Sequence, residues 1–216
     1  MYLQTTQRTH LDRELHGISI GRVSHGHVFM RSVVVHGQVG TRVSCSTLVV
    51  WDVDNIMPPN ENALLQTLRE LEVDSDCKVV LAANERTMRT LSMDRDGVVA
   101  RVYERFDAKA VDWIVTKRRK NAVDLILRDE IVRFARESMI LGKKKRCVCI
   151  SNDGDFAGPL AYAGYLGLHI VTIGTPKRSH HTTQRMKIKN ASLAEAADVS
   201  MVLEYEDGTT RLHEQR

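Results

Sequence analysis

Aspartates follow two separate apolar runs of the sequence, and their spacing is the strongest chemical signal in the chain. One run leads into Asp52 and Asp54 in "VWDVDN", and a later one leads into Asp153 and Asp155 in "CISNDGDF". Like charges about 4 Å apart repel by roughly 4 kcal/mol at an effective dielectric of about 20. If the two runs lie side by side, the carboxylates must hold protons at raised pKa or recruit a cation, whereas two separate solvated turns need neither.

A third acidic stretch, "KNAVDLILRDE", begins an expected helix. At about 100° per residue, Asp129 projects roughly 140° around the helix from Asp124, so Asp124 is the better ligand. Oxygen-only ligand sets suit Mg²⁺ or Mn²⁺, and such an ion can activate a water that attacks a phosphodiester. The predicted catalytic and metal-binding residues are Asp52, Asp124, Asp153 and Asp155.

Neighbouring polar residues have both a supporting and a plain interpretation. Asn55 either orients Asp52 or only forms a turn, and Ser151 either bonds a carboxylate or only ends a strand. Asp54 shares a face with Asp52 if the strand continues, whereas a turn would point it to solvent. The predicted supporting residues are Asn55, Ser151, Asp54 and Asp129.

Basic residues are unevenly distributed along the 216-residue chain, whose net charge is only +4. Three basic clusters in the second half favour a polyanion partner over solvated loops. No apolar run approaches the 18 residues of a membrane span. The predicted polyanion-binding residues are Lys117, Arg118, Arg119, Lys120, Lys143, Lys144, Lys145, Arg146, Lys177 and Arg178.

The four cysteines show no C-x-x-C spacing, which disfavours a zinc site. Cys147 and Cys149 occupy same-face positions of an expected strand. Such usage fits a reducing compartment.

From Thr47 onward, strand and helix patterns alternate, which predicts a parallel sheet with helices on both faces. Strands are expected over 47–53, 77–84, 98–104, 146–152, 168–174 and 199–205. Helices are expected over 60–71, 85–97, 122–140, 156–167 and 190–198. Ligands of such sheets bind beyond the carboxyl ends of the strands, which is where Asp52 and Asp153 fall.

Residues 1–45 differ from the rest, with five arginines, no lysine and only Asp12 and Glu14 as acids. This composition is typical of an organelle transit segment, although a plain extension or extra strand would also produce it. We therefore predict an N-terminal extension over 1–45, one domain over 46–206 and a C-terminal tail over 207–216. The expected location is mitochondrial, and otherwise cytoplasmic.

Four segments together resemble the NYN domain, a branch of the PIN-like ribonucleases, and the limkain type in particular. They are "VVWDVDNIMPP", "KNAVDLILRDEIVRFA", "CVCISNDGDFAGPLAYAGYLGLHIVTIG" and "ASLAEAADVSMVLEYED", in that order between Thr47 and Glu206 and just beyond. The resemblance implies a PIN-like three-layer α/β/α sandwich, an Mg²⁺ or Mn²⁺ site, and endoribonuclease activity on single-stranded RNA in RNA processing or turnover.

The family's motifs carry over residue by residue. Its D-x-x-N matches Asp52 and Asn55, and its helix-start aspartate matches Asp124. Its [ST]-x-D-x-D-F turn matches the stretch from Ser151 to Phe156, and the later helix acid of many members matches Asp129. Asp54 stands where glutamate or glycine is common, and the basic segment 175–189 is longer than a minimal domain needs.

Two other functions fit parts of the sequence. A haloacid-dehalogenase-like phosphatase would use Asp52 as nucleophile and Asp54 as acid, but that class does not account for "KNAVD". A catalytically silent PIN-like scaffold in a ribonucleoprotein or ribosome-assembly complex would also use the basic clusters. The sequence shows no accessory RNA-binding module, so a partner could supply specificity.

Overall fold

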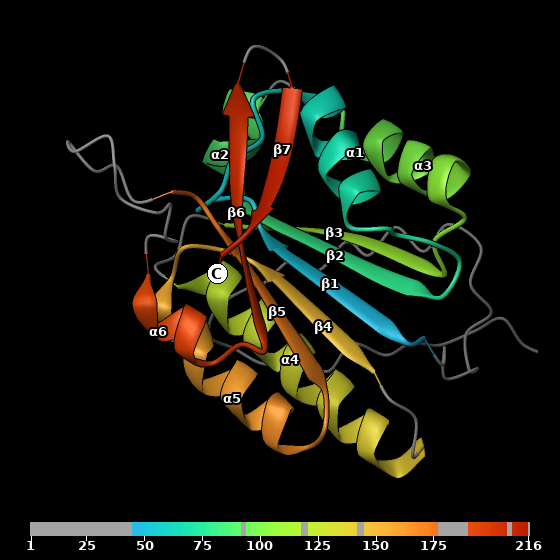
Figure 1. Ribbon diagram of the computed structural model, residues 1–216. Coiled ribbons are helices and arrows are strands. Elements are labelled where there is room, and N and C mark those ends of the chain that lie inside the picture. The colour runs from blue at the N-terminus through green and yellow to red at the C-terminus, as the bar shows by residue number, and fades with distance from the viewer. Residues whose placement is uncertain are drawn as a thin grey trace, which may run out of the picture.

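The computed structural model of the protein describes residues 45–91, 94–117, 121–141, 145–176, 190–206 and 209–215. Within these ranges the chain forms one sheet of seven strands, with helices packed on both sides of it (Figure 1). The strands are β1 (Thr47–Asp52), β2 (Cys77–Asn84), β3 (Ala110–Thr116), β4 (Arg146–Ile150), β5 (His169–Gly174), β6 (Val199–Glu206) and β7 (Thr209–Glu214). The helices are α1 (Glu61–Glu70), α2 (Glu85–Leu91), α3 (Arg95–Phe106), α4 (Ala122–Leu141), α5 (Ala157–Tyr165), α6 (Ala191–Glu195) and the 3-10 turn η1 (Gly154–Phe156). The expected three-layer α/β/α class is confirmed.

The strands lie in the order β3-β2-β1-β4-β5-β6-β7. All neighbouring pairs are parallel except β6 and β7. After β1 the chain adds β2 and β3 on one side, and it then returns to add β4, β5 and β6 on the other. Open α/β sheets bind ligands where the strand order reverses in this way, here between β1 and β4. We call the carboxyl ends of β1 to β5 the carboxyl edge, and their opposite ends the amino edge.

Two hydrophobic cores, one on each face of the sheet, hold the layers together. Val49 and Trp51 of β1 pack with α1 and α3, whereas Leu48 and Val50 pack with α4, α5 and α6. Strand β1 is therefore buried on both faces, as expected of a central parallel strand. Because successive side chains alternate between faces, Asp52 points to the face that α4 covers.

The expected strand over 98–104 is wrong, because these residues lie in the helix α3. Asp94 caps this helix by accepting a hydrogen bond from the Gly97 backbone N–H at 3.1 Å. Gly97, expected to end a helix, lies in the first turn of α3 instead. The buried side chains are Val98, Val99 and Val102, whose spacing places them on one helical face. The β-branched run was misleading because packing against α1 and β3 overrides local propensity.

The sheet also contains two strands that the sequence did not predict. Strand β3 is the outermost strand on one side of the sheet and pairs with β2 from Lys78 to Asn84. Strand β7 is the outermost strand on the other side and pairs with β6. The expected tail over 207–216 is therefore replaced over Thr209–Glu214 by a strand of the same sheet.

The remaining structural expectations concern the cysteines and the extension. Cys147 and Cys149 are free and buried on the same face of β4, as expected. Residues 1–44 lie outside the described residues, so the predicted transit segment stays a prediction. In the described ranges, none of the helices has the length and apolar character that crossing a membrane requires.

Candidate active site at the carboxyl edge

Asp52, the last residue of β1, is the most buried acid of the predicted site, with 1% of its surface exposed. Its Oδ2 accepts hydrogen bonds from Asn55 Nδ2 at 2.9 Å and from Ser151 Oγ at 2.9 Å. Its Oδ1 accepts from the Asn55 backbone N–H at 3.3 Å. Asn55 and Ser151 thus fix the orientation of the Asp52 carboxylate, which is one of the two interpretations that the sequence left open for each residue.

Ser151 joins the ends of the two central strands. Its hydroxyl donates to Asp52 and accepts from the Asp153 backbone N–H at 3.0 Å. Asp153 in turn caps η1, since its Oδ1 accepts from the Asp155 backbone N–H at 2.9 Å. The two acidic stretches, about a hundred residues apart, therefore meet at the strand-order reversal.

Asp124 reaches the same place from the helical layer. Asn121, with a left-handed φ of 59°, turns the chain from β3 into α4 and leaves Asp124 in the first helical turn. Asparagine tolerates this conformation better than most residues. Helix α4 follows β3 and crosses β1 and β2, so its first turn, which contains Asp124, stands at the carboxyl edge.

The pKa of Asp124 is affected by the charges of the other predicted acids. The pKa of this carboxyl is raised to about 6, first by burial and then by the negative charges of four other aspartates. These neighbours, in decreasing order of effect, are Asp52, Asp153, Asp155 and Asp54. Like charges disfavour ionisation, and they do so more strongly the closer they lie. All four predicted catalytic residues therefore share one electrostatic environment.

The pKa of Asp52 is also raised, mainly because burial removes the carboxylate from water. Hydrogen bonds from Asn55 and Ser151 act in the opposite direction by stabilising the ionised form. Asp52 is therefore a buried acid whose charge is only partly compensated.

The chemistry of this donor set fits a hard divalent ion, since it offers several carboxylate oxygens in one electrostatic environment. The side chains as they lie do not yet form a closed ligand shell. Among the described residues, no three His, Cys, Asp or Glu side chains stand close enough together to hold a metal ion. Asp153 and Asp155 are half-buried and exposed, so side-chain rotation is open to them.

Two other predicted residues, Asp54 and Asp129, do not lie where they could bind the same ion as Asp52. Strand β1 ends at Asp52, and Asp54 lies in the following turn, where its carboxylate accepts from the Asn84 backbone N–H at 2.9 Å and from Asn84 Nδ2 at 2.8 Å. Asp129 is exposed, and its charge acts on Arg133. The structure thus gives Asp54 a positioning role and does not join Asp129 to the site.

Sequence reasoning missed two asparagines that organise this edge. Asn84 ends β2 and holds Asp54. Asn152 donates to Thr175 Oγ1 at 2.9 Å and accepts from the Thr175 backbone N–H at 2.9 Å, which ties the end of β4 to the end of β5. A search for amides as well as acids at the end of each expected strand would have found both residues.

The basic clusters are divided between the two edges of the sheet. Lys117 is exposed directly after β3, at the carboxyl edge. Lys145 and Arg146 lie at the start of β4, at the amino edge. Lys145 is only 4% exposed, and its ammonium stacks 5.0 Å from the ring centroid of Phe134. These two predicted binding residues are therefore on the wrong edge for the site, and Lys145 is buried. The other basic positions, 118–120, 143–144 and 177–178, lie outside the described residues.

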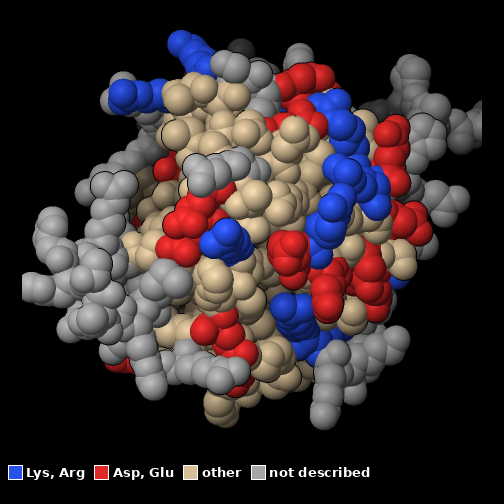
Figure 2. Space-filling model, turned by 45° about the horizontal axis from the view of Figure 1, so that its top comes forward, with Lys and Arg blue, Asp and Glu red and all other residues tan. Residues whose placement is uncertain are grey.

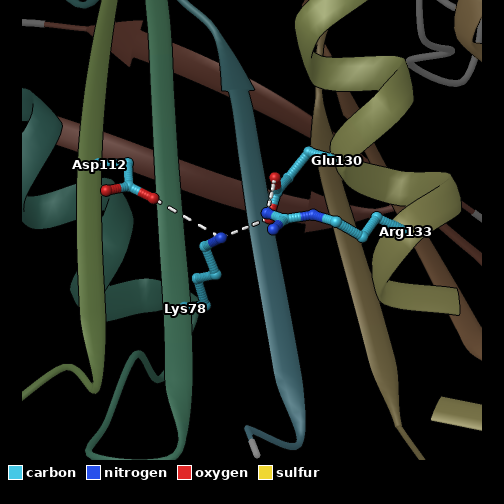
Figure 3. Close-up of polar contacts among 4 residues, drawn as sticks. All are labelled: Lys78, Asp112, Glu130 and Arg133. Carbon is cyan, nitrogen blue, oxygen red and sulfur yellow. Dashed lines mark hydrogen bonds and ion pairs between the residues drawn. The ribbon is translucent and has the colours of Figure 1, made fainter. Parts of the chain in front are cut away.

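A second charged group lies on the α4 face of the sheet (Figure 3). Lys78 of β2 bonds Glu130 of α4 and lies 3.6 Å from Asp112 of β3, while Arg133 also bonds Glu130. Burial raises the pKa of Glu130, but Lys78 and Arg133 together outweigh burial and leave it lowered. Acids and bases are thus paired in this group.

Comparisons with known proteins leave the family of the chain open. No family model and no curated protein matches the sequence. Among solved structures, the chain is similar to the crystal structure of a protein of unknown function from Vibrio parahaemolyticus. The two share 12% identity with a TM-score of 0.46, over 79% of this chain and 99% of that one. At this level of similarity, the likeness says nothing of what either protein does.

Proposed function

We propose that the protein is a metal-dependent endoribonuclease that hydrolyses single-stranded RNA. The observation that carries this proposal is the Asp124 carboxyl, whose pKa is raised to about 6 by burial and by four converging aspartates. Perturbed acids gathered at a ligand-binding position of the fold are typical of catalytic sites. RNA as substrate comes from the resemblance to NYN domains, which the position of these acids supports.

The residues of the chain have distinct roles in this proposal. Asp52 is fixed by Asn55 and Ser151, so it offers a carboxylate of defined orientation. Asp124, Asp153 and Asp155 would complete the set that holds Mg²⁺ or Mn²⁺. When bound, such an ion lowers the pKa of water and neutralises charge on the phosphoryl oxygens. Ser151 keeps the two acidic stretches in register.

The charge distribution supports binding at a defined track. Figure 2 shows a band of basic side chains on the face it presents, with acidic side chains on both sides of it. A strand of RNA would therefore be held by particular basic groups near the acids rather than by a uniform field. Lys117 is one such group, since it follows β3 at the carboxyl edge.

The proposal is tested by incubating the protein with a labelled single-stranded RNA in Mn²⁺, in Mg²⁺ and in EDTA. We expect internal cleavage with either ion, none in EDTA, and none for Asp153→Asn, which keeps the size of the side chain but removes its charge. Glu195→Gln, an exposed acid on α6, is the matched control and should cleave as the wild type does. Cleavage that persists in EDTA or in Asp153→Asn would contradict the proposal.

One observation favours a second function, a catalytically silent RNA-binding scaffold. The described acids do not form a closed ligand shell as they lie. A scaffold would bind RNA with equal affinity in the wild type and in Asp124→Asn, and neither would cut it. A phosphatase of the haloacid-dehalogenase type has less support, because Asp54, its required acid, is engaged by Asn84 through two hydrogen bonds.

A further inference from the structure

We propose that the short helix α2 is the element that binds the RNA backbone beside the acidic site, through Arg86 and Arg89. This inference rests on the proposed function and names the part of the site that holds the substrate. Neither arginine belongs to the basic clusters that stand out in the sequence. Their importance comes from where the fold places α2.

Helix α2 stands at the carboxyl edge and packs on the face of the sheet that α1 and α3 cover, whereas Asp52 and Asp124 lie on the α4 face at the same edge. It begins at Glu85, directly after β2 ends at Asn84, and it contacts β2 and β3 (Figure 1). Ala82, two residues before the end of β2, is the register partner of Asp52. Neighbouring strands are about 4.8 Å apart. A chain that crosses the acids towards β3 would therefore pass α2 and then Lys117.

A polar linkage fixes α2 to the loop that follows Asp52. The Asp54 carboxylate accepts two hydrogen bonds from Asn84, at 2.9 and 2.8 Å. Asn84 Oδ1 in turn accepts from the backbone N–H groups of Arg86 at 2.8 Å and Thr87 at 3.0 Å. This chain of bonds positions the first turn of α2 relative to the acidic site. Asp54 is thus a positioning residue of the proposed surface.

The side chains of α2 face outward to an unusual degree. The helix has no buried residue, and only Met88 and Leu91 are packed, partly buried, against the core. Arg86 and Arg89 are exposed and three residues apart, so they lie on the same side of the helix. Within the part of the chain that the structure describes, neither guanidinium forms an ion pair. Arg95, Arg101, Arg133 and Arg211, by contrast, each pair with an acid.

Two exposed guanidinium groups at the same edge of the sheet as the acidic site fit a phosphodiester chain. A guanidinium binds phosphate oxygens through two parallel hydrogen bonds, which fixes the strand as well as attracting it. The aspartates repel any anion, RNA included, so the arginines would hold the phosphates, and the scissile group would approach the acids only when a divalent ion is bound there. Charge complementarity therefore selects a phosphate backbone as the occupant.

The test measures binding of a labelled single-stranded RNA by fluorescence anisotropy, in EDTA and over a series of KCl concentrations. We expect the double substitution Arg86→Gln and Arg89→Gln to weaken binding about tenfold at low salt and to reduce the slope of log K against log salt by about 1.4. The matched control is Arg69→Gln with Arg105→Gln, which removes the same charge from the last turns of α1 and α3, at the amino edge. The control should keep the wild-type slope.

The outcomes separate this inference from the proposed hydrolysis. Equal affinity and slope in the α2 variant and the wild type, or an equal loss in the control, would overturn the role of α2. If the wild type cuts no RNA but loses affinity on substitution of α2, hydrolysis fails and the binding surface stands. If the wild type cuts RNA and the α2 variant binds RNA as tightly as the wild type, hydrolysis stands and the role of α2 in binding fails.

A second variant tests the linkage through Asp54. In Asp54→Ala, we expect faster hydrogen exchange at the amides of Arg86 and Thr87, together with a several-fold loss of RNA affinity. Faster exchange without any loss of affinity would overturn the positioning role of Asp54. Folding of the arginine variants is checked by thermal unfolding. Their unfolding temperatures should equal that of the wild type, because the substitutions change exposed side chains only.

Discussion

Helix α4 carries two half-buried acids, Asp124 and Glu130, that the fold treats in opposite ways. Glu130 is bonded by Lys78 and Arg133, and these bases lower its pKa in spite of its burial (Figure 3). Asp124, less than two turns away, is buried among other acids, and its pKa is raised to about 6. The two residues have the same charge and share one helix, so their neighbours alone account for the difference.

The comparison shows that this protein can neutralise a buried carboxylate with its own basic side chains. It does so at Glu130, where Lys78 bridges β2 to α4 and also approaches Asp112. At the carboxyl edge, the charges that act most on Asp124 are negative. Carboxylates that lie close together repel each other and lower the stability of the folded state. Such arrangements are found chiefly at functional sites. The predictions that follow test this difference between the two acids.

The largest expected effect is on catalysis. Asp124→Asn should lower the rate of RNA hydrolysis on the order of a thousandfold, which corresponds to about 4 kcal/mol, because a carboxylate of the ion-binding set is lost. Glu130→Gln should change the rate no more than about twofold when the protein is folded. Single-turnover cleavage at saturating protein measures both. Similar losses of cleavage rate in Asp124→Asn and Glu130→Gln would contradict the predicted difference between the two acids.

The next effect is the response of stability to a divalent ion. A ligand that binds only the folded state stabilises it by about 2.7 kcal/mol at a concentration a hundred times its dissociation constant. Mn²⁺ should therefore raise the free energy of unfolding of the wild type and of Glu130→Gln alike. Asp124→Asn should respond far less at the same concentration. Urea titrations with and without Mn²⁺ give the comparison, and an equal response in all three proteins would contradict it.

Loss of the Glu130 charge should destabilise the protein by about 2 kcal/mol at pH 7, since Lys78 would remain half-buried without its main partner. The Lys78 and Glu130 side chains are only 16% and 14% exposed. Because the folded pKa of Glu130 is lowered, its contribution is present above about pH 4.5 and is lost as the pH falls through the folded value. The difference between Glu130→Gln and the wild type should narrow accordingly in urea titrations below pH 4.

The smallest effect has the opposite sign. Asp124→Asn should stabilise the protein by about 1 kcal/mol at pH 8, once the shift is discounted for partial exposure. The folded pKa of Asp124 is raised, so the wild type loses stability as the pH rises from about 4 to about 6, and the cost then stays constant. The gain should vanish below pH 4. A variant that is less stable than the wild type at pH 8 would show that Asp124 is compensated after all.

Much of the site followed from the sequence because it depends on where strands end. Carboxylates after β1 and β4 had to meet at one edge, provided that the two strands were neighbours. The contacts of Asn55 and Ser151 with Asp52 were among the interpretations that the sequence left open. The engagement of Asp54 by Asn84 did not, because it depends on the strand ending at Asp52 and on β2 lying next to β1.

The failures have equally physical causes. The valine run of α3 resembles a strand because β-branched residues favour strands locally, and only packing shows its helical spacing. The cluster around Lys145 looked like a binding surface because charge alone does not tell which edge of a sheet a residue occupies. In the structure, Lys145 covers the Phe134 ring at the amino edge. The two arginines of α2 were overlooked because they do not form a run.

The closing strand β7 has a consequence for the order in which the chain can fold. Thr210 lies against α1, where its hydroxyl donates to the Ala63 carbonyl at 3.4 Å and its own carbonyl accepts from Gln66 at 3.4 Å. These partners are 147 and 144 positions apart in the sequence. Contacts of such long separation slow folding, because the intervening loop must close before they form. During synthesis on the ribosome, the first helix of the domain must therefore wait for nearly all of the chain before its outer surface is covered.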